Sequence, residues 1–99
     1  MSIGEPGQEA AACLAVDGEM TIYRAAELKP ALIDAVRAHA APALDLSAVT
    51  EFDSAGLQLL LAARREAARL GKPFAIAGTS PAVREVFALL GLDFEGAPA

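Results

Sequence analysis

The chain has 99 residues, of which 55% are hydrophobic, and its 13 acidic and 8 basic side chains give a net charge of −5 and a pI near 4.7. This length predicts a single domain with a modest core. The acidic balance argues against a nucleic-acid partner, because phosphate binding needs clustered Lys and Arg, and it disfavours an anionic membrane surface for the same reason.

The sequence shows no targeting or membrane-spanning segment. No continuous apolar run approaches the ~18 residues of a membrane span, and the N-terminus lacks the basic and apolar regions of a signal peptide. We therefore expect a cytoplasmic protein without membrane insertion. The single cysteine, Cys13, has no partner for an internal disulfide, and its apolar neighbours favour a small buried hydrophobe over a redox role.

The N-terminal part of the chain predicts a leader followed by a β-hairpin. Residues 1–10 carry Gly and Pro with few apolar anchors and are expected to form a flexible leader. Residues 13–16 and 20–23 are short apolar runs, and Asp17-Gly18 between them is a dipeptide favoured in tight turns. These two runs are therefore expected to pair as a hairpin.

Residues 25–40 are predicted to form a helix, because Leu28, Leu32 and Val36 recur at helical spacing. The only histidine, His39, lies near the end of this helix. No Cys, His or nearby acid stands at ligand spacing from it, so we expect no metal site.

The middle of the chain predicts a buried strand, a turn and a second helix. Residues 43–46 form a short apolar run with a single acid, Asp45, as expected for a strand that brings a polar group to a sheet edge. Asp53 or Ser54 then stands at or beside the N-cap of a helix over residues 54–70. Amide donors are unsatisfied at such an end, so a side-chain oxygen or a phosphate there is stabilised by hydrogen bonds and by the helix dipole.

The helix over residues 54–70 has a wide apolar face when its residues are placed at ~100° each. The residues predicted to face the core are Gly56, Leu59, Leu60, Ala63, Ala67 and Leu70. Leu57, Leu61 and Ala68 fall on the flank of that face. Two interpretations of the flank remain open: it is the rim of a wide core face, or it is a partner surface close to Ser54.

The C-terminal part predicts a strand and a third helix. Gly71-Lys72-Pro73 ends the preceding helix, and residues 74–77 are expected to form a short strand. Ser80 is predicted to be the N-cap of the third helix, with Pro81 at its first position and Gly91 closing it.

Strands that alternate with helices predict an α/β domain over residues 11–94. We expect a small, mainly parallel sheet of about four or five strands with three helices. Residues 92–94 are expected to form a last short strand or to pack on the core, and residues 95–99 to form a frayed tail. Polar residues follow three of the predicted strands, so we expect them to gather at the carboxyl edge of the sheet, where sites form in such folds.

These segments together resemble the STAS domain, the family of bacterial anti-sigma factor antagonists and of sulfate-transporter tails. The matching segments are Asp45-Leu46-Ser47, Val49, Phe52-Asp53-Ser54-Ala55-Gly56-Leu57, Ser80-Pro81-Ala82-Val83 and Leu90-Gly91-Leu92. The resemblance extends from about residue 13 to about residue 94 and implies a STAS-like fold. In that family the hydroxyl residue after the aspartate is phosphorylated by a partner kinase, which by resemblance is Ser54 here. Arg24 stands where family members commonly have Ser or Thr, so the first helix is expected to start with an atypical cap.

The resemblance implies a protein-binding module that is controlled by phosphorylation. Its partner would be a serine kinase that doubles as an anti-sigma factor: the unphosphorylated antagonist binds this kinase, the phosphorylated antagonist lets go, and a phosphatase resets the switch. The residues expected at the partner surface are Asp45, Asp53, Ser54, Gly56, Leu57, Leu61, Thr79 and Ser80. A phosphate adds about −1.5 to −2 charges, which near Asp53 and Asp45 is expected to repel an acidic partner surface without refolding the domain.

Other functions within the same family remain open. Small STAS subunits also serve as structural accessories of phospholipid-transport ABC complexes, where this edge packs on an ATPase subunit, and a chemotaxis or two-component regulator would use the same phosphoserine logic. These accessory subunits often have Thr at the position of Ser54, so the serine slightly favours a phosphorylation-controlled binding module over an accessory subunit.

An enzyme is the least favoured reading of the sequence. A hydrolase nucleophile elbow needs Gly two residues before the serine, where this chain has Phe52. Asp45 and Asp53 would form an acid pair without a base or a metal ligand. The chain also has no Gly-rich phosphate loop, and we expect no catalytic residue and no cofactor.

Overall fold

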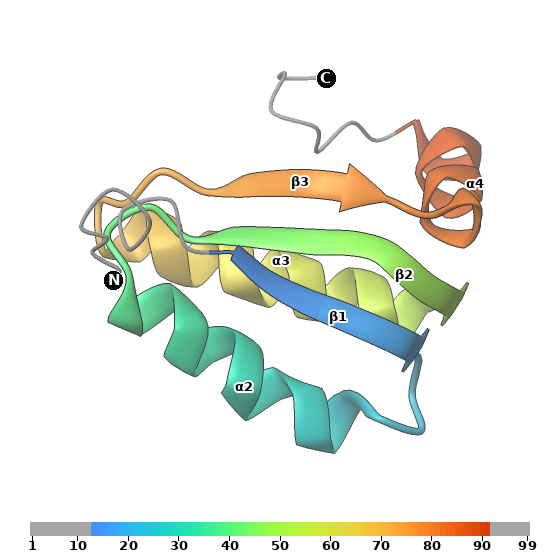
Figure 1. Cartoon of the computed structure of the whole chain (residues 1–99), viewed down its shortest axis with the longest axis horizontal. Helices are drawn as coiled ribbons and strands as arrows, with labels where there is room; N and C mark the ends of the chain where they lie inside the picture. Colours follow the sequence, from blue (N-terminus) through green and yellow to red (C-terminus); the bar gives the residue numbers. More distant parts are fainter. Residues whose placement is uncertain (1–12, 92–99) are drawn as a thin grey trace, which may run out of the picture.

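The computed structural model describes residues 13–91, which form a sheet with helices packed on one of its faces (Figure 1). The elements follow in the order β1 (Cys13–Met20), α2 (Ala25–Ala38), β2 (Ala43–Phe52), α3 (Ser54–Arg69), β3 (Ala75–Thr79) and α4 (Pro81–Leu90). The three strands lie in the order β1-β2-β3, and both pairings are parallel. The predicted α/β class with three helices is thus confirmed, with three strands in the described residues where four or five were expected.

Several sequence predictions lie outside the described residues. These are the leader at residues 1–10, the last short strand at 92–94 and the tail at 95–99. Within residues 13–91, no helix combines the length and the hydrophobicity that crossing a membrane requires.

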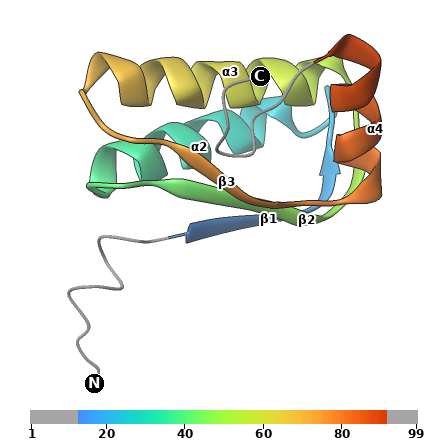
Figure 2. The ribbon, with the colours of Figure 1, turned by 90° about the horizontal axis from the view of Figure 1, so that it is seen from above.

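The sheet is covered by helices on one face only in the described part of the chain. Helices α2 and α3 lie side by side over this face, and α4 lies at the end of the molecule (Figure 2). In β2, Leu44 and Leu46 are buried under the helices, whereas Asp45 and Ser47 alternate with them on the opposite face. The alternation explains why the apolar run of β2 contains a single acid.

The core lies between the sheet and the helices. Its buried hydrophobic residues are Val16, Met20, Leu28, Leu32, Val36, Leu44, Leu46, Val49, Leu57, Leu59, Leu60, Ala63, Ala67, Ile76, Val83 and Phe87. Helix α4 joins this core through Phe87, whose ring meets the ring of Phe52 edge to face, with centroids 6.0 Å apart and planes at 78°. Aliphatic side chains therefore make up most of the core, as the low aromatic content indicates.

The predicted N-terminal hairpin is wrong, because β1 continues through the dipeptide that was expected to turn. Gly18 has φ +73°, and the pairing of β1 with β2 shifts register on either side of it, as at a bulge. The guanidinium of Arg24 donates to the carbonyl oxygens of Asp17 and Glu19, at 2.6 Å and 2.9 Å. This side chain satisfies carbonyls at the irregular part of the strand, so a turn former is accommodated inside β1.

Two of the predicted helix ends are confirmed. The hydroxyl oxygen of Ser80 accepts from the amide of Val83 at 3.2 Å, and Pro81 is the first residue of α4. Gly91 ends α4 in the left-handed conformation, with φ +68°. At the start of α2, Arg24 makes no side-chain cap, as its position in the sequence indicates.

One carboxylate joins α2 to α3 near the C-terminal ends of both helices. Glu66 on α3 accepts from Arg37 Nε on α2 at 2.8 Å and from Arg69 Nη2 at 2.7 Å. The hydrogen bond from Arg69 and then that from Arg37 lower the pKa of Glu66 from 4.5 to about 2. The side chain of Lys72 also caps α2, because its ammonium donates to the carbonyls of Val36 and Arg37, both at 2.8 Å.

The lowered pKa of Glu66 predicts a stability contribution that depends on pH. A carboxylate with a lower pKa in the folded state than in the unfolded state stabilises the fold above the unfolded value, and this contribution is lost as the pH falls through the folded value. We expect Glu66→Gln to lower the melting temperature at pH 7, and the difference from the parent protein to shrink between pH 4.5 and about 2. Thermal unfolding followed by circular dichroism at several pH values measures this difference, with Glu85→Gln on the exposed surface of α4 as the control. A difference that stays constant down to pH 2 would contradict the prediction.

Candidate functional site

Asp53 binds two separate segments of the chain through its carboxylate. It is the N-cap of α3, and its Oδ1 accepts from the amides of Ala55 at 2.9 Å and Gly56 at 3.1 Å. Its Oδ2 accepts from the amide of Ile22 at 3.2 Å, in the turn between β1 and α2. One side chain therefore fixes the start of α3 against the turn that leads into α2.

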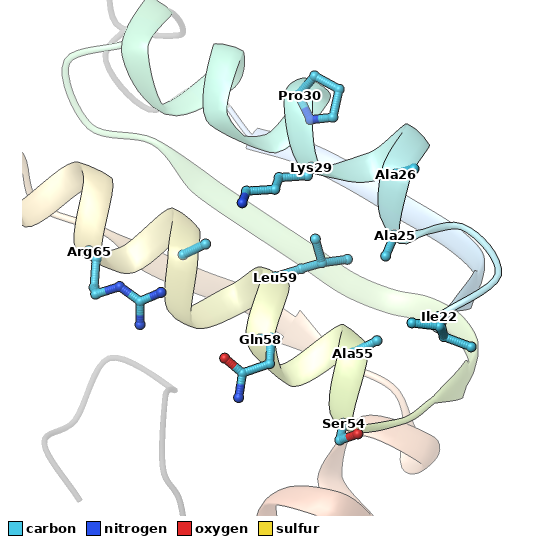
Figure 3. Close-up of a pocket in the computed structure, with 11 residues that line it drawn as sticks. Ile22, Ala25, Ala26, Lys29, Pro30, Ser54, Ala55, Gln58, Leu59 and Arg65 are labelled. Atoms are coloured by element: carbon cyan, nitrogen blue, oxygen red, sulfur yellow. The ribbon is translucent and has the colours of Figure 1, made fainter.

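Ser54 is the first residue of α3 and is exposed. The sequence left open whether Asp53 or Ser54 caps this helix, and the structure assigns the cap to Asp53. The hydroxyl of Ser54 is consequently not used as a cap and lies at the end of a groove between α2 and α3 (Figure 3).

This α2–α3 groove is open to solvent and has a volume of about 640 Å³. Its apolar lining includes Ile22, Ala25, Leu59 and Ala62, and the short alanine side chains leave space between the two helices. Figure 3 shows Lys29 extending from α2 towards α3, whereas Gln58 and Arg65 extend from the outer edge of α3, away from α2. The groove thus combines an apolar lining with two cations.

The turn between β1 and α2 exposes two large hydrophobic side chains next to this site. Ile22 is 65% exposed and Tyr23 is 87% exposed. The predicted hairpin would place both in a strand with one buried face, so the sequence pattern does not indicate their exposure. The sequence pattern also does not single out Lys29 and Arg65. The only signal for a hollow beside them is the recurrence of alanines in both helices.

Two residues expected at the partner surface, Gly56 and Leu57, are buried instead. A Cβ atom on Gly56 would overlap the carbonyl oxygen of Met20 and lie 2.9 Å from the ring of Phe52, so this glycine lets α3 approach the sheet closely. Leu57 is 9% exposed and belongs to the core, which decides the two interpretations of its flank in favour of a core rim.

Three further residues expected at the partner surface differ in exposure. Leu61 is half-buried and packs against the core, like a rim residue. Ser80 is 3% exposed, and its hydroxyl serves the start of α4. Thr79 is half-buried at the end of β3, where its register partner on β2 is Leu46.

Asp45 lies far from Ser54, which corrects the expectation that the polar loops share one edge. Asp45 is the third residue of β2 and Asp53 follows its last residue, so at ~3.3 Å per residue they are ~25 Å apart. Asp45 interacts with Ser47 instead: the hydroxyl and the amide of Ser47 donate to Asp45 Oδ1 at 2.6 Å and 3.0 Å. The hydroxyl and then the amide of Ser47 hold the pKa of Asp45 below its ordinary value. The strands differ in length: β3 ends opposite Leu46, whereas β2 continues to Phe52. The end of β3 therefore lies near Asp45 and Ser47, and the end of β2 lies near Ser54.

Cys13 is exposed on β1, in contrast to the buried position that its neighbours indicate. Partial desolvation raises the pKa of its thiol, and the charge of Asp45 raises it further. A raised pKa keeps the thiol protonated and therefore less nucleophilic. Within residues 13–91, no three His, Cys, Asp or Glu side chains are grouped to hold a metal ion.

A comparison with known protein families assigns the chain to one of them. The family model described as "Mlab, STAS domain" matches residues 3–94. The chain belongs to the STAS domain family. No curated protein matches the chain.

A solved structure agrees with this assignment of the STAS domain. The anti-sigma factor antagonist SpoIIAA in its unphosphorylated form is similar with a TM-score of 0.66 and 23% sequence identity, over 81% of this chain and 71% of that one. At this identity the likeness concerns the fold.

The two roles of Asp53 in this STAS domain can be separated by substitution. Asp53→Asn keeps an oxygen for the helix cap but turns an amide donor towards the amide of Ile22, so we expect it to lose about 1 kcal/mol of stability. Asp53→Ala removes both roles and is expected to lose about 2 kcal/mol. Urea denaturation measures both values. Equal losses for the two variants would contradict a separate contribution from the bond to Ile22.

Gly56→Ala tests the close approach of α3 to the sheet. Helix propensity alone predicts that Ala stabilises this position by about 1 kcal/mol. We expect the opposite, a loss of about 2 kcal/mol, because the new methyl group would overlap the backbone at Met20 and the ring of Phe52. Chemical denaturation gives the sign directly, and a stabilised variant would refute the packing argument.

Proposed function

We propose that this STAS domain is a phosphorylation-controlled protein-binding module of the anti-sigma factor antagonist type, with Ser54 as the phosphorylated residue. The observation that carries the proposal is the exposed hydroxyl of Ser54 on the first turn of α3, which Asp53 leaves unused by taking the cap. The exposed Ile22 and Tyr23 beside it offer apolar contact area to a partner. The fold shared with a protein described as an anti-sigma factor antagonist supports the same function.

The proposed reaction takes place on the Ser54 oxygen. A partner kinase with bound ATP transfers the γ-phosphoryl group: a new P–O bond forms to Ser54, the bond to ADP breaks, and the hydroxyl proton leaves to a base of the kinase. In this proposal the domain is a substrate and a ligand of other proteins in the cytoplasm and catalyses no reaction itself.

The first turn of α3 has little capacity to absorb the added phosphate. The amides of Ala55 and Gly56 already donate to Asp53, and the amide of Leu57 donates to the carbonyl oxygen of Asp53 at 3.0 Å. This differs from the expectation that amides at this end are free. The phosphate therefore adds its charge, about −1.5 to −2, to the surface that faces the partner, next to the carboxylate of Asp53. The proposed switch is a local change of charge, without refolding.

The proposed partner is a serine kinase that also acts as an anti-sigma factor, with a phosphatase that resets Ser54. The unphosphorylated domain binds this kinase, and the phosphorylated domain is released. The partner surface is proposed to include Asp53, Ser54 and the turn at Ile22 and Tyr23. The hydrogen bond from the amide of Ile22 to Asp53 and the exposure of Ile22 and Tyr23 support this choice.

A second candidate function is that of a structural accessory subunit in a phospholipid-transport ABC complex. The matching family model, described as "Mlab, STAS domain", is the reason to keep it. In that case the same end of α3 would pack on an ATPase subunit and Ser54 would stay unmodified. A chemotaxis or two-component regulator would use phosphorylated Ser54 with a different output.

Phosphorylation assays distinguish these candidates. We expect a serine kinase of the same organism to phosphorylate Ser54 in the presence of ATP, with the site located by mass spectrometry, and to leave Ser54→Ala unmodified. Ser54→Asp should bind that kinase at least about ten-fold more weakly than Ser54→Ala, because one negative charge is placed on the docking surface.

Thr50→Asp is the matched control, because it adds the same charge at an exposed position of β2. It is expected to leave the affinity for the kinase unchanged. Phosphate on a residue other than Ser54, or equal affinities of Ser54→Asp and Ser54→Ala, would reject the switch.

A further inference from the structure

The basic side chains of this acidic domain are almost all engaged within the molecule. Of its eight Lys and Arg residues, six interact with other parts of the domain: Arg24, Arg37, Arg64, Arg69, Lys72 and Arg84. The remaining two, Lys29 and Arg65, form no hydrogen bond or ion pair with another residue in the range 13–91. Both line the α2–α3 groove.

The lining of the groove is suited to apolar side chains from another molecule. Leu59 and the exposed Ile22 provide apolar contact, and alanines at positions 25, 55 and 62 leave room for larger groups. The volume of about 640 Å³ is enough for several side chains. A ligand that fills the groove and also meets Lys29 and Arg65 must therefore be apolar on one side and acidic at its margins.

The walls of the groove favour a helix over an extended segment. Both walls are helices, α2 and α3, whose backbone groups are paired within each helix, so an extended peptide would find no edge with which to pair its own amides and carbonyls. A helix satisfies its own backbone and needs only side-chain contacts, which is how amphipathic helices bind grooves between helices.

We propose that the α2–α3 groove binds an amphipathic helix of the partner protein, whose apolar face fills the groove and whose flanking carboxylates pair with Lys29 and Arg65. This inference rests on the proposed function, because Ser54 lines the same groove. Charge complementarity carries it: the two cations without a partner among the described residues of a domain with net charge −5 stand on the two walls of one groove.

The position of Ser54 links this groove to the proposed switch. A phosphate on Ser54 occupies one end of the groove and brings negative charge towards an acidic helix. Release of the partner then follows from repulsion and lost space at the site of docking itself.

The test uses the full chain and a synthetic helix as the probe. The peptide is stapled, has the length of α3, and carries a stripe of Leu flanked by Glu; a matched peptide has Gln in place of each Glu. In ¹H–¹⁵N NMR titrations we expect the Glu peptide to shift the amide signals of Ile22, Ala55 and Ala62 and to leave α4 unchanged. The Gln peptide is expected to bind about ten-fold more weakly, because two exposed ion pairs are lost.

Variants of the domain identify the cations. Lys29→Gln combined with Arg65→Gln should weaken the Glu peptide by about ten-fold and leave the Gln peptide unaffected. Arg64→Gln, beside Arg65 on α3 but not in the groove lining, is the control and should change the affinity by less than about two-fold. Circular dichroism confirms that each variant is folded.

Several outcomes would overturn the proposal. These are equal binding of the two peptides, no binding at millimolar concentration, shifts confined to other surfaces, and shifts of the groove signals on dilution without peptide, which would assign the groove to a second copy of the chain. If the peptides fail while a kinase still phosphorylates Ser54 and is released, only the groove proposal falls. If the Glu peptide binds as expected but no kinase modifies Ser54, the groove stands and the phosphorylation switch falls.

Discussion

The carboxylate of Asp53 is the interaction on which the arrangement of this STAS domain depends. Its two oxygens accept three backbone amides, two at the start of α3 and one in the turn before α2. Because both segments bind the same side chain, the end of β1, the start of α2 and the start of α3 are fixed relative to one another. Two consequences follow: the hydroxyl of Ser54 is released from capping, and Ile22 is held with its side chain exposed beside it. The motif Asp-Ser-x-Gly-Leu thus builds an exposed serine on a rigid frame, and its Gly and Leu serve the packing beneath.

The α2–α3 groove lies between two such constraints. At one end Asp53 holds the two helix starts, and at the other end Glu66 joins α2 to α3 through Arg37. Alanines from both helices line the groove, so the helices are held together without filling the space between them. Gly56 lets α3 approach the sheet closely at the Asp53 end, on the side of the helix that faces the core. The hollow is therefore a consequence of residue size on two fixed helices, and it does not require a defect in the core.

The sequence predicts correctly those features that depend on neighbouring residues. The predictions that are wrong concern features set by contacts between residues far apart in the chain. The Ser80 cap, Pro81 and Gly91 were read correctly because a helix end is set by local hydrogen bonds. Asp17-Gly18 was misread as a turn because pairing with β2, and the guanidinium of Arg24, hold it inside a strand. The distance from Asp45 to Ser54 depends on the unequal lengths of the strands, which no local pattern encodes. Leu57 is covered because the α3 face that contacts the sheet and α2 is wider than one helical stripe.

The electrostatics of the domain explain how a single phosphate could control a surface of this kind. The net charge of −5 would by itself repel any acidic partner, yet the α2–α3 groove presents Lys29 and Arg65 without an acid from the described residues to neutralise them. Attraction at this groove is therefore local and acts against an unfavourable background. A phosphate on Ser54 contributes a charge of about the same size as the two cations together, and it does so at the same groove. Because the amides of Ala55 and Gly56 already donate to Asp53, they are not available to neutralise the charge of a phosphate on Ser54. In the proposed switch, the balance between binding and release therefore depends on two cations and one phosphate, with the same backbone in both states.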